Sequence, residues 1–114
     1  MTTSASGGDR FARVSERIAY AAQKMQKHNL FDSERMFCDV YCFEPGQEQA
    51  PHSHAGSDKV YYVIEGVADI RIGDETRRLE AGGVAHAPPD VSHGVVNPGP
   101  ERLALLVFMA PKPR

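Results

Sequence analysis

The chain has 114 residues, enough for one domain, with 13 basic, 15 acidic and 5 histidine side chains. A net charge of −2 without a clustered basic stripe excludes an electrostatic surface for nucleic acid. No apolar run approaches the roughly 20 residues that span a bilayer, and residues 1–10 hold no apolar signal segment. We therefore expect a cytoplasmic protein that binds neither nucleic acid nor membrane.

Glycine and proline are distributed unevenly along the chain. None of the 10 glycines and 8 prolines falls in residues 9–44, whereas 16 of these 18 fall from Pro45 onward. Because such a density of helix breakers interrupts any long helix, the distribution excludes an all-helical bundle. It predicts a helical N-terminal part followed by many short strands and tight turns.

The N-terminal part of the chain begins with small, polar residues over 1–9, which we expect to form a disordered leader. From Phe11 to Met25 apolar residues recur at intervals of three and four, as on one face of an amphipathic helix. This spacing predicts an N-terminal helix within residues 10–30 that packs on the main body. His28, near the end of that helix, is expected to face solvent.

Residues 33–114 are expected to form one β domain. The segment 35–44 is apolar on both faces of an extended chain, so both faces should be covered. Its two cysteines, Cys38 and Cys42, would lie about 13 Å apart on one strand, which is too far for a disulfide. Short strands separated by turn residues are typical of a sandwich or small barrel. Further strands are expected over residues 60–65, 67–72, 84–87, 91–96 and 103–109.

Four of the five histidines lie in the β region, at positions 52, 54, 86 and 93. His52 and His54 are two residues apart, so in an extended segment both side chains point to the same side. Two imidazoles placed in this way can bind one metal ion. Alone, the pair is weak evidence for a metal site and fits two surface histidines in a loop better.

The wider spacing resembles the two sequence motifs of the cupin superfamily. In the first motif, Gly46 is followed after five residues by His52-Ser-His54, after four more by Lys59, and after six more by Gly66. In the second motif, Gly82, Pro88, Asp90, His93 and Asn97 stand at the family's spacing. The sequence departs from the family at two positions, since the family has glutamate where Lys59 stands and glycine where Asp90 stands.

This resemblance implies an all-β fold, a double-stranded β-helix or jelly-roll barrel with one mononuclear metal site near one mouth. His52, His54 and His93 match the three histidine ligands of the family. The cofactor implied is one divalent transition metal per chain, which can be iron, zinc, nickel, manganese or copper. Lys59 replaces the usual fourth ligand, and a protonated ammonium has no lone pair to donate.

Three interpretations of this replacement stay open. Water can fill the open positions of a three-histidine centre, a carboxylate of Asp58 or Glu48 can substitute, or the site can hold no metal. If Lys59 points inward, it can act as a general base or anchor an anionic substrate. Otherwise its stem packs at the barrel mouth while its ammonium reaches solvent.

Two further side chains are candidates for the site. Tyr61 lies on the same side of its strand as Lys59, and the two are the candidate catalytic residues. The alternative for Tyr61 is a tyrosine at the edge of the core. His86 is either a supporting or fourth ligand of the metal, or a partly buried histidine with an ordinary hydrogen bond.

Three classes of function fit these features. The first is a metal-dependent enzyme that acts on a small polar molecule by oxygenation, isomerisation or elimination. The second is a non-catalytic module that binds a small ligand or metal as a sensor or store, and the third is a purely structural barrel. The resemblance also implies a homodimer formed through outer strands, for which the doubly apolar segment 35–44 is suited.

Overall fold

The computed structural model describes residues 10–113, so the leader predicted for residues 1–9 lies outside the described part. Within that range the chain forms nine β-strands and one short 3-10 turn, Val14–Glu16. The all-β fold is therefore confirmed. The strands are β1 (Gln26–Asp32), β2 (Phe37–Phe43), β3 (Glu48–His52), β4 (Asp58–Glu65), β5 (Val67–Ile72), β6 (Glu75–Glu80), β7 (Val84–Ala87), β8 (His93–Val96) and β9 (Leu103–Ala110).

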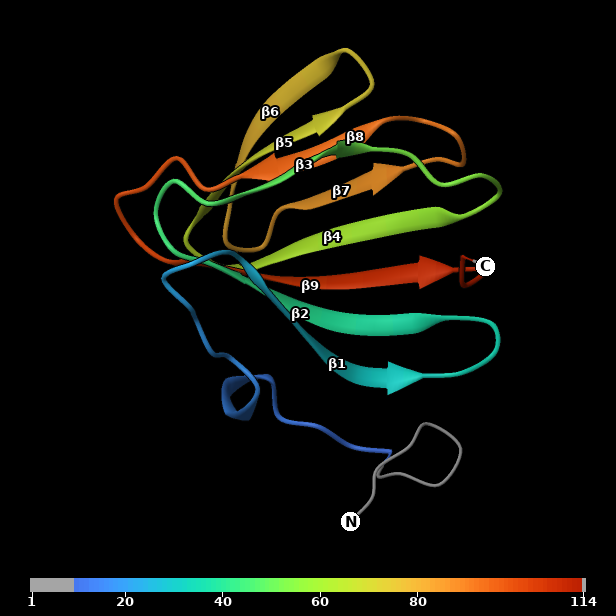
Figure 1. Cartoon of the computed structure of the whole chain (residues 1–114), viewed down its shortest axis with the longest axis horizontal. Helices are drawn as coiled ribbons and strands as arrows, with labels where there is room; N and C mark the ends of the chain where they lie inside the picture. Colours follow the sequence, from blue (N-terminus) through green and yellow to red (C-terminus); the bar gives the residue numbers. More distant parts are fainter. Residues whose placement is uncertain (1–9, 114) are drawn as a thin grey trace.

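The strands form two antiparallel sheets, which face each other as the two layers of a double-stranded β-helix (Figure 1). The five-stranded sheet has the order β1-β2-β9-β4-β7, and the four-stranded sheet has the order β3-β8-β5-β6. Among the described strands, only β1–β2 and β5–β6 are joined as hairpins within one sheet. Each of the other connections crosses between the sheets, so the chain winds the two layers around one core.

One of these crossings depends on glycine. Gly66 connects β4 to β5 with a φ of +87°, a conformation that side chains disfavour. A Cβ at this position would lie next to the backbone of β9, because Leu103 Cα is only 2.9 Å from where it would stand. The first motif therefore needs glycine here for both its conformation and its close packing.

The core fills the space between the sheets, and the inward side chains of β2, β4 and β9 supply most of it. The second face of β2 is also covered, since Cys38, Val40 and Cys42 are all buried. Both cysteines are free thiols, as predicted. Burial raises the pKa of Cys38 to about 11, which disfavours its reactive thiolate form.

The helix predicted within residues 10–30 is wrong. Only Val14–Glu16 forms a turn of 3-10 helix, and residues 26–32 extend as β1 along the edge of β2. A lone helix of this length is marginal in water, whereas the edge of β2 offers a complete row of hydrogen-bond partners. Side chains of the β domain also bind the irregular segment: the His28 ring donates to Ala19 O at 2.9 Å, and Gln47 Nε2 donates to Ala21 O at 2.7 Å.

The predicted strands agree well with the structure. Those over 67–72 and 84–87 match β5 and β7 at both ends, and the other four differ by one or two residues at an end. Three strands, β1, β3 and β6, were not predicted. None of the described residues belongs to a helix long and apolar enough to cross a membrane.

Candidate metal centre

Three histidines converge at one mouth of the barrel. The ring centroids of His52 and His93 are 4.4 Å apart, and those of His52 and His54 are 4.9 Å apart. One nitrogen of each ring lies within 4.8 Å of the corresponding nitrogens of the other two. The structure therefore brings together all three predicted ligands.

The strand arrangement explains this convergence. His52 ends β3 and is the direct cross-strand partner of His93, which begins β8. The register of β3 shifts between Gln49 and His52. Because of this bulge, the side chains of Gln49 and His52 both point into the barrel, although the two residues are three positions apart. The same bulge leaves Glu48 exposed on the outer side, and it does not reach the histidines.

Backbone carbonyls fix the orientation of two of the rings. His52 Nδ1 donates to Ala50 O, and His93 Nδ1 donates to Val91 O, both at 2.9 Å. Because a carbonyl can only accept, Nδ1 carries the proton and Nε2 keeps a free lone pair. Metal-binding histidines commonly have this kind of supporting hydrogen bond.

The free lone pair of His93 is buried. Among the described residues, His93 Nε2 has no hydrogen-bond partner although the side chain is only 2% exposed. A buried polar atom without a partner costs free energy, and such atoms are rare in native proteins. A metal ion at the centre of the three rings would satisfy this atom, so the donor set fits a transition metal.

The protonation state of the cluster also suits a cation. Burial lowers the pKa of His52, His54 and His93 below the ordinary value of 6.5, and repulsion from Lys59 lowers them further. For His93 the pKa falls to about 4. The three rings are therefore neutral at pH 7, which is the form that binds metal.

The loop that carries His54 is fastened to the second motif. Asp90 N donates to His54 O at 3.0 Å, and Asp90 has a φ of 68°. This left-handed conformation explains why the family has glycine here, and aspartate is one of the few other residues that tolerate it. The departure at this position therefore preserves the geometry of the site.

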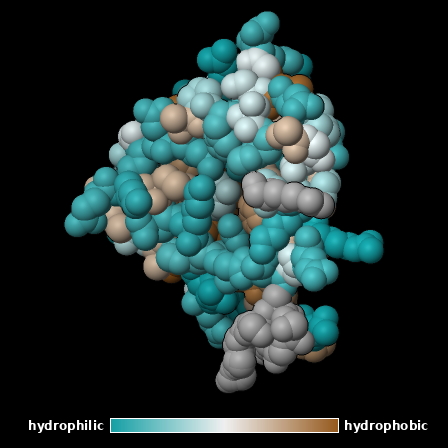
Figure 2. Space-filling model, turned by 45° about the vertical axis from the view of Figure 1, so that its right-hand side comes forward, coloured by the Kyte–Doolittle hydropathy of each residue, from teal (hydrophilic) through white to brown (hydrophobic). Residues whose placement is uncertain are grey.

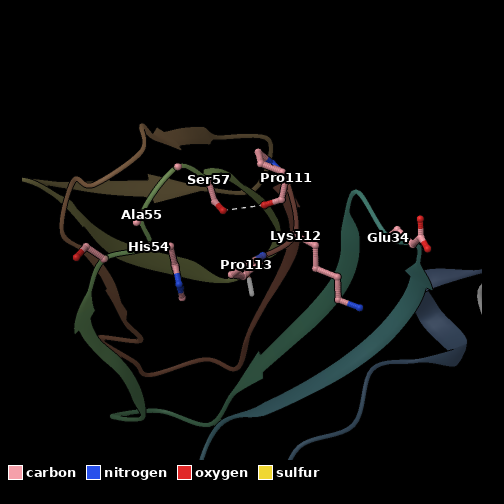
Figure 3. A pocket seen from close by; sticks show the side chains of 9 residues that line it. Glu34, His54, Ala55, Ser57, Pro111, Lys112 and Pro113 are labelled. Atoms are coloured by element: carbon pink, nitrogen blue, oxygen red, sulfur yellow. Dashed lines mark hydrogen bonds between the residues drawn. The ribbon is translucent and has the colours of Figure 1, made fainter.

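Two hollows meet beside the histidines. One, of about 410 Å³, lies between His52, His54 and the inward side chains of β1, β2 and β4. The other, of about 570 Å³, lies on the opposite side of His54, where Figure 3 shows Ser57 hydrogen-bonded to Pro111. Ser57 Oγ donates to Pro111 O at 2.7 Å, which holds the C-terminal residues in the wall of this mouth.

Lys59 points into the first hollow from β4 and is only 1% exposed. Its Nζ lies 5.3 Å from the ring centroid of Tyr41 and 5.2 Å from that of Tyr61, close enough for cation–π contact with both. Burial, and then repulsion from Lys27, lowers the pKa of Lys59 to about 7. The position where the family has a ligand therefore carries a buried amine that titrates near neutrality.

Tyr61 lies beside the cluster, fully buried, with its ring centroid 6.1 Å from that of His93. Its hydroxyl donates to Gln49 Oε1 at 3.2 Å, and burial raises its pKa above the ordinary value. The sequence interpretation missed three polar side chains of the hollow: Lys27, Tyr41 and Gln49. Lys27 was missed because residues 10–30 were expected to form a helix, and Gln49 was missed because strand β3 was not predicted.

The other candidate ligands do not reach the cluster. Asp58 precedes Lys59 on β4 and so points to the outside of the sheet. There its Oδ1 lies 2.7 Å from His86 Nε2, and both side chains are more than half exposed. His86 is thus a hydrogen-bonded surface histidine rather than a supporting group of the site.

The chain is similar to known proteins over most of its length. An uncharacterized protein of Streptomyces coelicolor is 31% identical over 101 residues, 88% of this chain and 95% of that protein. The polyketide synthase CurC of Streptomyces cyaneus is 33% identical over 81 residues, 68% of this chain and 52% of that protein. The crystal structure of TT1209 from Thermus thermophilus has a TM-score of 0.89 and 42% identity, covering 92% of this chain and all of that one. A family model for the cupin domain matches residues 39–109, and the chain therefore belongs to the cupin family.

Proposed function

We propose that this cupin binds one divalent transition metal ion through His52, His54 and His93 and acts on a small polar molecule. The observation that carries the proposal is the buried Nε2 of His93, which has no partner within residues 10–113 and lies where three neutral rings meet. A metal bound there supplies a Lewis acid or a site for dioxygen chemistry. Oxygenase, isomerase and lyase reactions are all compatible with this donor set.

The chain's own contribution to a reaction would come from Lys59. Its pKa of about 7 allows the amine to accept or release a proton at neutral pH. The rings of Tyr41 and Tyr61 hold Nζ in the hollow, and Gln49 orients the hydroxyl of Tyr61. We assign proton transfer to Lys59 and positioning to Tyr61.

A non-catalytic sensor or store is the second candidate. The observation that favours it is the raised pKa of both Tyr41 and Tyr61, which leaves neither hydroxyl able to act as a base near neutral pH. If Lys59 only holds a charged ligand, the site binds without turnover. Cytoplasmic location stays a prediction from the sequence.

Metal titration tests the proposal. The protein stripped of metal should bind one Zn²⁺ per chain at pH 7 in a calorimetric titration, and the His54→Ala variant should bind more weakly by at least about ten-fold. The matched control is His86→Ala, which removes a histidine on the outside of the barrel and should bind as the wild type does. Equal binding by His54→Ala and wild type, or no binding by wild type, would contradict the three-histidine site.

We also propose that the chain forms a homodimer. Tyr62, Val84 and Phe108 are 39%, 59% and 38% exposed on the outer face of the five-stranded sheet. Their strands, β4, β7 and β9, are hydrogen-bonded neighbours, and Tyr62 is the direct partner of Val84. These side chains form an apolar surface that a second copy can cover.

Light scattering tests the dimer. The wild type should have twice the chain mass at micromolar concentration, and Phe108→Asp should shift it toward the monomer, because burying an unpaired carboxylate is costly. Arg77→Asp, a charge change on the other sheet, is the control and should leave the mass unchanged. A wild-type mass of one chain would refute the proposed interface.

A further inference from the structure

We propose that the hollow beside the three histidines takes a small organic carboxylate, whose charged end is held by Lys59 and Lys27. This inference rests on the proposed function, because it names the class of ligand that the same site would take. It stands on three features of the hollow: an unpartnered buried amine, a second amine at the same ring, and an apolar wall.

The first feature is the isolation of Lys59. Within residues 10–113, no acceptor lies within hydrogen-bond distance of its Nζ and no carboxylate lies within ion-pair distance. A buried lysine is normally paired, since an uncompensated charge in the interior is expensive. Two aromatic faces lessen this cost, but the ammonium still has three donors without acceptors. An anion in the hollow would supply them.

The second feature is Lys27, which enters the hollow from β1 as the direct cross-strand partner of Tyr41. Its Nζ lies 5.3 Å from the centroid of the Tyr41 ring, as does that of Lys59. Lys27 likewise has no ion-pair partner in the described part of the chain. The two amines line the same hollow and repel each other, and a carboxylate bound in that hollow would offset the repulsion.

The nearest acidic group does not neutralise the pair. Asp39 lies on the inward side of β2, and its Oδ1 accepts a hydrogen bond from Asn29 Nδ2 at 2.8 Å. It contributes one carboxylate against two lysine side chains, and a pKa of about 7 leaves most of the Lys59 amine protonated at pH 6.5. The hollow therefore has an excess of positive charge before any metal ion is bound, and a bound ion increases it.

The third feature favours an organic acid over an inorganic anion. Phe37, Tyr41, Pro51 and Met109 line the same hollow of about 410 Å³, so an apolar body has surfaces to pack against. His52 and His54 line its other side. Figure 2, which brings this side of the molecule forward, shows a mostly hydrophilic surface with hydrophobic side chains set between. A carboxylic acid with a short apolar body thus matches both the positive charge of the two lysines and the apolar lining of the hollow.

Binding of benzoate and of its neutral isostere benzamide tests the inference. Ligand-observed NMR titrations use metal-free and Zn²⁺-loaded full-length protein at pH 6.5 in chloride-free buffer. Wild type should bind benzoate at least ten-fold more tightly than benzamide, since hydrogen bonds to charged groups are the stronger ones. Lys59→Met should weaken benzoate binding at least about ten-fold, Lys27→Met should weaken it by a smaller factor, and neither should change benzamide binding. Lys112→Met is the control, because Lys112 lies at the other hollow.

The outcomes separate this inference from the proposed function. Benzoate selectivity that depends on both lysines in metal-free protein supports the anion site even if no Zn²⁺ binds. Normal Zn²⁺ binding with equal affinity for benzoate and benzamide overturns the anion site and leaves the metal site standing. Benzoate binding that is the same in wild type, Lys59→Met and Lys27→Met also overturns it. Lys27 is exposed, so its variant remains informative if Lys59→Met fails to fold.

Discussion

His93→Ala should weaken Zn²⁺ binding by at least about 100-fold without unfolding the metal-free protein. Groups that only orient a metal ligand commonly contribute 10- to 100-fold to affinity, so removal of a ligand should cost at least the upper figure. In the metal-free protein two effects oppose each other, each on the order of 1–3 kcal/mol. The variant loses the packing of a buried ring, and it also loses a buried nitrogen that has no partner in the described part of the chain.

Thermal unfolding with and without Zn²⁺ provides the measurement. At a free concentration 100 times the dissociation constant, the ion should add about 2.7 kcal/mol to the free energy of unfolding of wild type. At the same Zn²⁺ concentration this gain should fall to about 0.4 kcal/mol or less in His93→Ala and should be retained in the outer-face control His86→Ala. A variant that keeps the full gain would show that His93 is not a ligand.

Lys59→Met should stabilise the metal-free protein near pH 7 and change how its stability depends on pH. The pKa of Lys59 is about 7 in the folded state against an ordinary value of 10.5. Between these values the unfolded state binds one more proton than the folded state, so wild-type stability rises with pH by up to about 1.4 kcal/mol per unit. The cost of burying the charge is fully present below pH 7 and disappears above pH 10.5.

Urea unfolding at pH 7, 8.5 and 10 measures this effect. The advantage of Lys59→Met over wild type should be greatest at pH 7 and should shrink by up to about 4 kcal/mol by pH 10. Lys24→Met, at an exposed lysine, should follow wild type at every pH. If the free energies of unfolding of Lys59→Met and wild type change equally with pH, the surroundings of Lys59 do not lower its pKa.

The sequence was informative about the site because two motifs fix the spacing of turns and ligands. His52, His54 and His93 were predicted together, and their convergence follows from strands that the turns at Gly46, Gly66 and Gly82 delimit. Lys59 was recognised as the unusual position, and the choice between an inward and an outward side chain needed the structure. Its burial depends on the partners of β4 in the sheet, which are distant in sequence.

The three missed strands have one physical property in common: β1, β3 and β6 all lie at an edge of a sheet. Edge strands are covered on fewer sides than central ones, so they carry polar residues and lack a clear hydrophobic alternation. Strand β6, Glu75–Glu80, has five exposed residues of six. Strand β3 also contains Pro51, which an edge strand with a bulge tolerates and a central strand does not.

The N-terminal helix was predicted wrongly because apolar periodicity reflects only the segment in which it occurs. The apolar spacing from Phe11 to Met25 suits a helix, yet in the structure Phe11 is 82% exposed. What decides the conformation of 26–32 is the unpaired edge of β2, which comes later in the chain. Such an influence of tertiary structure on a weak local preference has no signal within the segment itself.

The histidines and the lysines of the site stand on different sheets. His52 and His93 belong to β3 and β8 of the four-stranded sheet, whereas Lys27 and Lys59 belong to β1 and β4 of the five-stranded sheet. Selection can therefore alter a lysine of the hollow without disturbing the strands that carry His52 and His93. A descendant with another side chain at position 27 would keep the three histidines and present a different group to a molecule in the hollow. The two-sheet architecture thus makes new specificities accessible through single substitutions.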